Sequence, residues 1–139
     1  MVATDIKHIH VTCAIIEREG LVLAAQRSAI MSMPYKWEFP GGKIDPGESA
    51  AQCLRREILE ELGIQIVVGE SLPAKTHDYP TFTVTLYPFV SAIETGEMAL
   101  HEHVAITWLP PDKLHTLDWA EADLPVIRSY LDECRAAAS

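Results

Sequence analysis

Residues 42–64 read GKIDPGESAAQCLRREILEELGI, a glycine-containing loop that runs directly into a helix-forming segment. Ser49 and Gln52 have the spacing of a capping box, which predicts that the helix begins at Ser49. Gly63 suits the left-handed residue that follows a helix, so we expect the helix to end at Leu62. This stretch therefore places one well-bounded helix directly after a tight loop.

Two sets of side chains share this helix. Apolar residues recur every four positions and predict its buried face, and they are Ala50, Leu54, Ile58 and Leu62. Beside that face lie Glu57, Glu60 and Glu61, at the spacing i, i+3 and i+4. Glu60 and Glu61 occupy the last turn, where the helix dipole disfavours anions by roughly 0.3–1 kcal/mol each. A hard divalent cation would offset this cost, and an ordinary solvated acidic face is the alternative.

The fixed residues of this stretch resemble the complete Nudix box: Gly42, five residues, Glu48, seven residues, Arg56-Glu57-Ile58, one residue, Glu60-Glu61, one residue and Gly63-Ile64. Similarity to the MutT-like and CTP-pyrophosphohydrolase branch extends to WEFPGGK at 37–43, HEH at 101–103 and ADLPVI at 122–127. It runs from about residue 8 to about residue 131. The resemblance implies an α/β/α sandwich with a mixed central sheet, and we expect residues 1–139 to form one domain.

The resemblance also implies a Mg²⁺ site, with Mn²⁺ as a substitute in vitro. Its ligands would be the Gly41 carbonyl and the carboxylates of Glu57, Glu60, Glu61 and Glu102. Glu57 and Glu102 are both candidates for the general base, and the sequence does not choose between them. Arg56 belongs with this catalytic group. It would orient the ligands together with Glu48, while Gly42 and Gly63 are structural.

Substrate contacts are assigned by resemblance and by side-chain chemistry. Arg27 and Lys43 are candidate phosphate contacts. Asp123 stands where relatives carry an Asn or Asp that reads a base edge, and capping of the last helix is its alternative role. Three aromatic residues, each equally suited to a core position, are candidates to stack on the base: Trp37, Tyr79 and Phe82. An aromatic residue at position 82, where MutT has a basic one, argues against strict selectivity for 8-oxoguanine.

Composition agrees with the small enzyme that the resemblance implies. The net charge of −9 disfavours a protein that grips polymeric DNA or RNA through its phosphates. Three cysteines without metal-type spacing, Cys13, Cys53 and Cys134, indicate reduced thiols. No signal-peptide pattern or membrane-length apolar run is found, so we expect a cytoplasmic monomer or homodimer that binds no membrane.

The reaction expected from this resemblance is hydrolysis of a nucleoside triphosphate to a monophosphate and pyrophosphate. Oxidised or modified deoxynucleotides such as 8-oxo-dGTP, or CTP and dCTP analogues, are the expected substrates. One alternative is a Nudix hydrolase of ADP-ribose or dinucleoside polyphosphates. Another is a catalytically silent nucleotide-binding domain, which the presence of all three box glutamates Glu57, Glu60 and Glu61 disfavours.

Alternation of apolar residues and turn-forming residues predicts the remaining elements. Strands are expected at 8–16, 21–26, 64–68, 81–87 and 104–108, the first two as a hairpin. Pro88 is expected to end the strand at 81–87, because proline cannot donate to a sheet ladder. A final helix is expected over 121–135, with Pro125 in its first turn.

Overall fold

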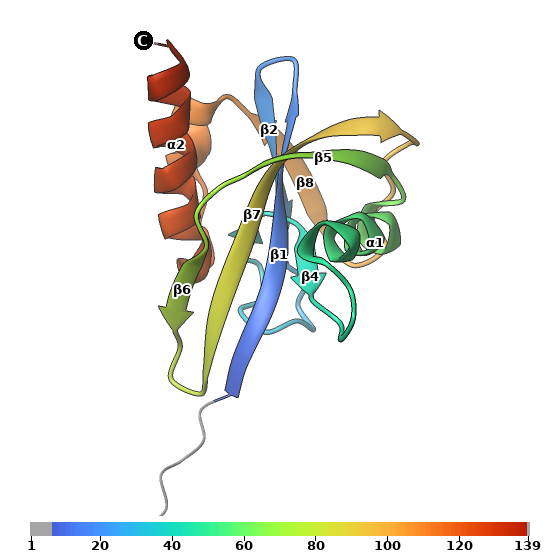
Figure 1. Cartoon of the computed structure of the whole chain (residues 1–139), viewed down its shortest axis with the longest axis vertical. Helices are drawn as coiled ribbons and strands as arrows, with labels where there is room; N and C mark the ends of the chain where they lie inside the picture. Colours follow the sequence, from blue (N-terminus) through green and yellow to red (C-terminus); the bar gives the residue numbers. More distant parts are fainter. Residues whose placement is uncertain (1–6, 139) are drawn as a thin grey trace, which may run out of the picture.

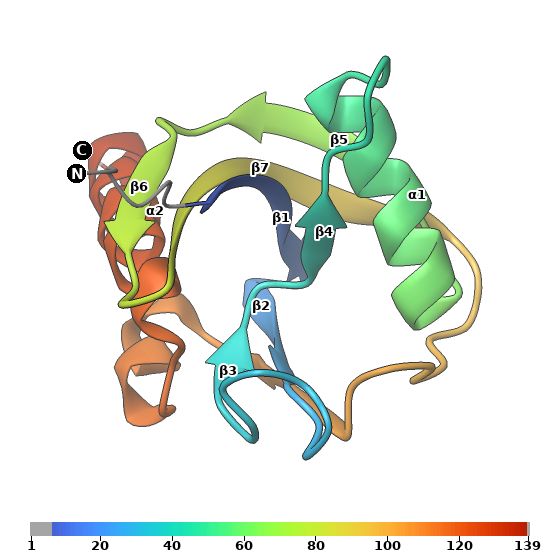
Figure 2. The same ribbon diagram turned by 90° about the horizontal axis from the view of Figure 1, so that it is seen from below.

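The computed structural model describes residues 7–138, and within them a mixed β-sheet lies between two α-helices (Figures 1 and 2). The strands are β1 (Lys7–Arg18), β2 (Leu21–Gln26), β3 (Trp37–Glu38), β4 (Gly41–Lys43), β5 (Gln65–Ser71), β6 (Lys75–Asp78), β7 (Phe82–Thr95) and β8 (Ala105–Leu109). The helices are α1 (Ala50–Leu62) and α2 (Leu124–Ala138), with two short 3₁₀ helices at Pro111–Thr116 and Glu121–Asp123. The expected α/β/α sandwich is confirmed.

The centre of the sheet is the parallel pair β1 and β7, which stay in register from Lys7 opposite Phe82 to Glu17 opposite Ala92. On one side β2 and β4 pair with β1, and β2 also pairs with β3 and β8. On the other side β5 and β6 both pair with β7. All of these outer pairings are antiparallel, so the sheet is mixed.

The alternation of β1 explains why both faces of the sheet are covered. Cys13 and Ile15 point into the apolar cluster shared with α2, whereas Ala14 and Ile16 point into the cluster shared with α1. All four are almost fully buried, as expected for a central strand with a helix on each side. Among residues 7–138, no helix is long and apolar enough to cross a membrane.

The caps predicted for α1 are present. The Ser49 hydroxyl accepts from the Gln52 N–H at 3.1 Å, and the Gln52 side chain accepts from the Ser49 N–H at 2.8 Å. Gly63 adopts a φ of 70°, and its N–H donates to the Leu59 carbonyl at 3.0 Å. Helix α1 therefore has the ends that the sequence predicts, and its Glu57 lies against Gly42 of β4.

The prediction that Pro88 ends its strand was wrong, because β7 continues through it to Thr95. The Pro88 carbonyl accepts from the Leu72 N–H at 2.9 Å, so the side of Pro88 without an N–H faces the link between β5 and β6. The missing N–H thus falls between the pairings of β5 and β6 with β7, where the sheet tolerates a proline. The final helix also differs from its prediction, since residues 121–123 form a 3₁₀ turn and α2 itself begins at Leu124.

Candidate active site

A cavity of about 290 Å³ lies where α1, β3, β4 and the loop before β8 meet, and we call it the glutamate cavity. Its lining residues are Val11, Thr12, Cys13, Arg27, Met31, Glu38, Phe39, Gly41, Gly42, Lys43, Glu57, Glu61, Leu86, Glu102 and Asp123. Most of the predicted site residues are thus brought together. They come from segments that are far apart in the sequence.

Gly41 and Gly42 form one wall of this cavity, where a side chain at Gly41 would overlap backbone and one at Gly42 would displace Glu57. A Cβ on Gly41 would overlap the Thr12 carbonyl of β1, with which β4 pairs. A Cβ on Gly42 would overlap the carboxylate of Glu57. The two glycines therefore let β4 lie directly against the strand on one side and against the helix carboxylate on the other.

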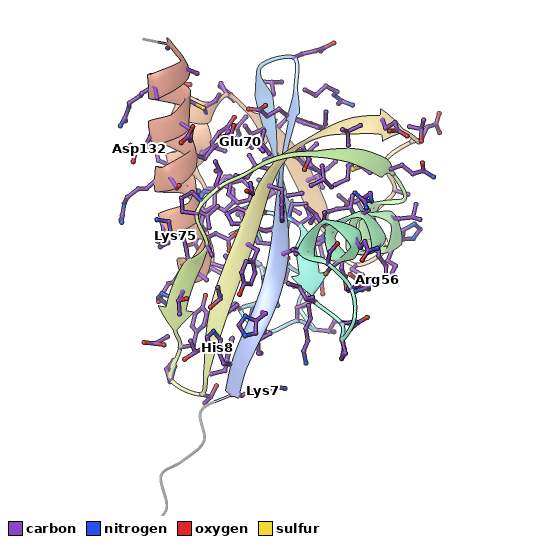
Figure 3. The ribbon with its side chains drawn as sticks, in the orientation of Figure 1. Lys7, His8, Arg56, Glu70, Lys75 and Asp132 are labelled. Atoms are coloured by element: carbon purple, nitrogen blue, oxygen red, sulfur yellow. The ribbon has the colours of Figure 1, made fainter. Side chains whose placement is uncertain are left out.

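Arg56 organises the carboxylates of the box from its place on α1 (Figure 3). Its Nη2 donates to Glu48 at 2.6 Å, and its Nη1 donates to Glu57 at 2.9 Å and to Glu60 at 3.4 Å. The hydrogen bond from Arg56 is the main reason why the pKa of Glu48 falls to about 2. Arg56 and Glu48 thus tie the loop to the helix, as predicted from the box.

Glu61 is the most unusual carboxylate of the site. It is buried, with 4% of its surface exposed, and its Oε2 has no hydrogen-bond partner. Burial raises its pKa to about 10, with further contributions from the negative charges of Glu38, Glu102 and Glu57. Burial also raises the pKa of Glu57. Four carboxylates thus face one small space, where their mutual repulsion favours a bound cation or a bound proton.

These residues fit a hard divalent cation. An unpartnered buried oxygen on Glu61 with Glu57 and Glu102 nearby is an all-oxygen donor set of the kind that Mg²⁺ prefers. Within residues 7–138, no three carboxylate, histidine or cysteine side chains already converge closely enough to hold an ion. Glu57 and Glu60 are instead turned to Arg56, so they would have to rotate to hold a cation.

The opposite wall carries a network that the sequence did not reveal. Glu38 on β3 accepts from Arg27 Nη1 at 2.6 Å and from His103 Nε2 at 2.8 Å. Arg27 also donates to the Ser32 carbonyl at 2.6 Å. Arg27 therefore lines the cavity as a partner of Glu38 and of the loop after β2. One available signal for Glu38 was a charged residue between the two aromatics of WEF.

Asp123 is buried at the inner end of the cavity, and its side chain does not cap α2. Its Oδ2 accepts from the Phe39 N–H at 2.9 Å, which replaces the predicted capping alternative. Burial, followed by the charge of Glu38, raises the pKa of Asp123 well above its ordinary value. The neutral acid is therefore favoured, with an oxygen left over to meet a ligand.

Seven predicted site residues do not line this cavity, and they are Trp37, Tyr79, Phe82, Glu48, Arg56, Glu60 and Gly63. Trp37, Tyr79 and Phe82 pack against the apolar cluster under α2, and the Tyr79 hydroxyl accepts from the Ala122 N–H at 3.0 Å. Each is used in packing, and their role as stacking residues stays a prediction. Glu60 has a side chain that is 58% exposed and lies beside Arg56.

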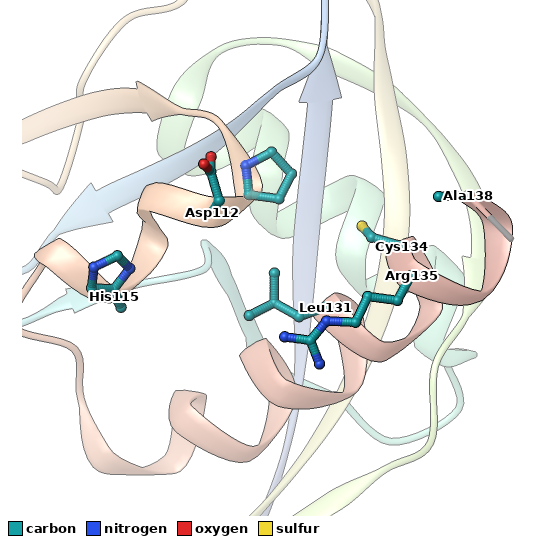
Figure 4. A pocket seen from close by; sticks show the side chains of 7 residues that line it. Asp112, His115, Leu131, Cys134, Arg135 and Ala138 are labelled. Atoms are coloured by element: carbon teal, nitrogen blue, oxygen red, sulfur yellow. The ribbon is translucent and has the colours of Figure 1, made fainter.

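A second cavity, of about 430 Å³, lies between the Pro111–Thr116 turn and α2 (Figure 4). Its lining residues are Pro111, Asp112, His115, Leu131, Cys134, Arg135 and Ala138. None of them belongs to the predicted site. The smaller glutamate cavity is therefore the candidate active site.

Comparisons with known proteins agree with this geometry. The model of the NUDIX domain family matches residues 6–130. The Escherichia coli protein named CTP pyrophosphohydrolase is 38% identical over 125 residues, covering 90% of this chain and 93% of that protein. The 8-oxo-dGTP diphosphatase of Haemophilus influenzae is 31% identical over 130 residues, covering 93% and 96%. The solution structure of the E. coli ORF135 protein superimposes with a TM-score of 0.80 at 37% identity, covering 95% and 94%.

Proposed function

The chain belongs to the Nudix family, and from that premise we propose that it is a Mg²⁺-dependent pyrophosphohydrolase of nucleoside triphosphates. The observation that carries the proposal is the buried, unpartnered Oε2 of Glu61, in a cavity that Glu57, Glu102 and the two glycines Gly41 and Gly42 also line. Such a site is costly for the fold unless a cation is bound there. The names of the relatives support the reaction class.

The ion, when bound, supplies neutralisation of the phosphate charge and lowers the pKa of a water molecule. Glu57, Glu61 and Glu102 would hold it, with the Gly41 carbonyl and Glu60 as further ligands. Lys43, exposed at the rim, is placed to meet phosphate oxygens. Glu57 or Glu102 takes the proton of the attacking water. The anhydride bond at the internal phosphate then breaks, giving a nucleoside monophosphate and pyrophosphate.

The base is proposed to lie at Asp123 and the Phe39 backbone. A neutral carboxylic acid offers one donor and one acceptor, which matches the amino donor and the ring-nitrogen acceptor of cytosine. An ionised carboxylate offers acceptors only. CTP or dCTP analogues therefore suit the site. The edge of 8-oxoguanine has an added N7–H donor beside the O6 acceptor. It therefore also presents one donor and one acceptor, so 8-oxo-dGTP is the second candidate.

The test of the reaction class is a release assay with Mg²⁺ that scores pyrophosphate and orthophosphate separately. The panel contains CTP, dCTP, 5-methyl-dCTP, dGTP, 8-oxo-dGTP, ADP-ribose and a diadenosine polyphosphate. We expect pyrophosphate from the cytosine or the 8-oxoguanine triphosphates. Activity confined to ADP-ribose or the diadenosine compound would assign the chain to the conjugate-hydrolysing alternative. No metal-dependent activity on any compound would favour a silent binding domain.

Asp123→Ala is expected to lower kcat/KM for the preferred triphosphate by roughly 5–150-fold, the range for losing one bidentate base contact. Asp123→Asn, which stays neutral and keeps both a donor and an acceptor, is expected to lose much less.

Because ionisation of Asp123 removes its donor, raising the pH through its elevated pKa should lower the wild-type rate relative to that of Asp123→Asn. Steady-state kinetics on CTP and 8-oxo-dGTP across pH measure this ratio. Unchanged kcat/KM in Asp123→Ala for every nucleotide would contradict the base assignment.

A further inference from the structure

The loop between β7 and β8 carries Glu102 to the glutamate cavity, and it is held mainly by its backbone. The His101 N–H donates to the Glu61 carbonyl at 3.0 Å, which uses an acceptor left open at the end of α1. The Val104 N–H donates to the Gln26 carbonyl at 3.1 Å. These bonds fix the chain on both sides of Glu102. The two residues between these bonds, Glu102 and His103, have no backbone anchor of this kind.

His103 provides an anchor at this point through its side chain. It is flanked by the exposed residues Glu102 and Val104, yet its own side chain is completely buried. Its Nε2 lies 2.8 Å from Glu38 Oε2, on a strand 65 residues earlier in the chain. A carboxylate oxygen only accepts, so the proton is assigned to Nε2. His101, by contrast, is exposed, and the two histidines do not point to a common ion.

Glu38 is the group through which this anchor reaches the metal site. Its carboxylate lines the glutamate cavity, and its charge is among the causes that raise the pKa of Glu61 and of Asp123. Arg27 holds one Glu38 oxygen and His103 holds the other, so both oxygens are fixed. Loss of either partner would free a negative group to turn within the site.

We propose that His103 is a positioning residue for the metal centre, where its bond to Glu38 fixes the Glu102 loop against the wall opposite α1. This inference rests on the proposed function for the role of the cation. Removing a residue that hydrogen-bonds to the groups around a metal, without touching the metal itself, typically changes metal affinity or activity by about 10–100-fold. The residue itself does not touch the substrate.

The test compares three substitutions at position 103 with a matched control. His103→Leu removes the donor, His103→Asn is too short to reach Glu38, and His103→Gln keeps an N–H near the position of Nε2. His101→Gln alters the exposed histidine on the other side of Glu102. Mn²⁺ affinity of the nucleotide-free protein is measured by titration calorimetry, and the Mg²⁺ concentration for half-maximal activity is measured on CTP or 8-oxo-dGTP. Melting temperatures identify variants that fail to fold.

We expect His103→Leu and His103→Asn to weaken Mn²⁺ binding about tenfold or more and to raise the Mg²⁺ requirement in parallel. KM for the nucleotide at saturating Mg²⁺ should stay within about threefold. His103→Gln and His101→Gln should behave like the wild type. Adding Glu38→Ala to His103→Leu should cost little beyond the larger single effect, because both substitutions remove the contact between these two side chains.

Mn²⁺ affinities within twofold of the wild type in both His103→Leu and His103→Asn would overturn the proposal. An equal loss in His101→Gln would also overturn it, since the effect would then belong to the loop in general. If His103→Leu does not fold, the comparison of His103→Asn with His103→Gln decides. The Mn²⁺ measurement uses no nucleotide, so it remains valid even if the release assay assigns a different substrate class.

Discussion

Glu57→Gln is expected to lower turnover by about 10²–10³-fold, because several kcal/mol of transition-state stabilisation depend on the cation that this carboxylate would hold. The fold should survive. A glutamine has the same shape, it still fits against Gly42, and its oxygen still accepts from Arg56 Nη1, which lies at 2.9 Å in the wild type. Pyrophosphate release at saturating Mg²⁺ measures the loss, and circular dichroism with a thermal scan checks the fold.

The matched control is Glu133→Gln, an exposed carboxylate on α2 that is remote from the cavity. It removes the same charge and should leave turnover unchanged. Mn²⁺ titration of the same variants separates two roles, since loss of a ligand weakens metal binding and loss of a general base alone does not. Near-normal turnover in Glu57→Gln would show that the metal-site assignment is wrong.

The side of the site formed by the box was predictable because its determinants are local in sequence. The capping box of Ser49 and Gln52, the stop at Gly63 and the i, i+4 spacing of the glutamates all act within a few residues. The hydrogen bond between Arg56 and Glu48 is also local, because the two residues are only eight positions apart in the sequence. A helix with known ends fixes which of its side chains meet, so this half of the cavity follows from its own segment.

The opposite wall could not be read in this way, because its contacts join segments far apart in the chain. Glu38 lies on a strand of two residues and meets His103, which lies in a loop without periodicity. No local pattern reports such a pairing. Aromatic residues posed a different difficulty, since Trp37, Tyr79 and Phe82 suit a base platform and a core equally well. Their packing against the cluster under α2 shows the core use, and the stacking use stays a prediction.

Asp123 illustrates a role that depends on burial as well as position. The sequence allowed either a helix cap or a base contact at the start of the last helix. The bond from Phe39, 84 residues away, aims the side chain into the cavity, and burial then favours its neutral form. The donor that we propose for base recognition thus arises from the tertiary structure, because an exposed aspartate at the same position would be an acceptor only.

Glu61 links the stability of the fold to the proposed metal site. Its pKa of about 10 in the folded chain exceeds the value near 4.5 expected for an unfolded glutamate. A raised folded pKa means that the full stability is present below pH 4.5 and is lost progressively as the pH rises towards 10. In that window folding of the metal-free protein must take up a proton, at a cost of up to ~1.4 kcal/mol for each pH unit. A cation that replaces this proton would restore the stability.

Glu61→Gln is therefore expected to lower turnover about 10²-fold or more while raising the melting temperature of the metal-free protein. At pH 8 with EDTA, relief of even ~1 kcal/mol corresponds to a gain of roughly 4 °C for a chain of this size. The gain should shrink towards pH 5, where the wild-type carboxyl is protonated in the folded state and less of it is ionised in the unfolded state.

Added Mg²⁺ should stabilise the wild type and leave the variant nearly unchanged, because a ligand stabilises only the folded state that binds it. Thermal scans at pH 5 and pH 8, with and without Mg²⁺, measure all four values. A variant less stable than the wild type in EDTA at pH 8 would show that Glu61 is ionised and paired without metal, which would remove the main support for a cation at this site.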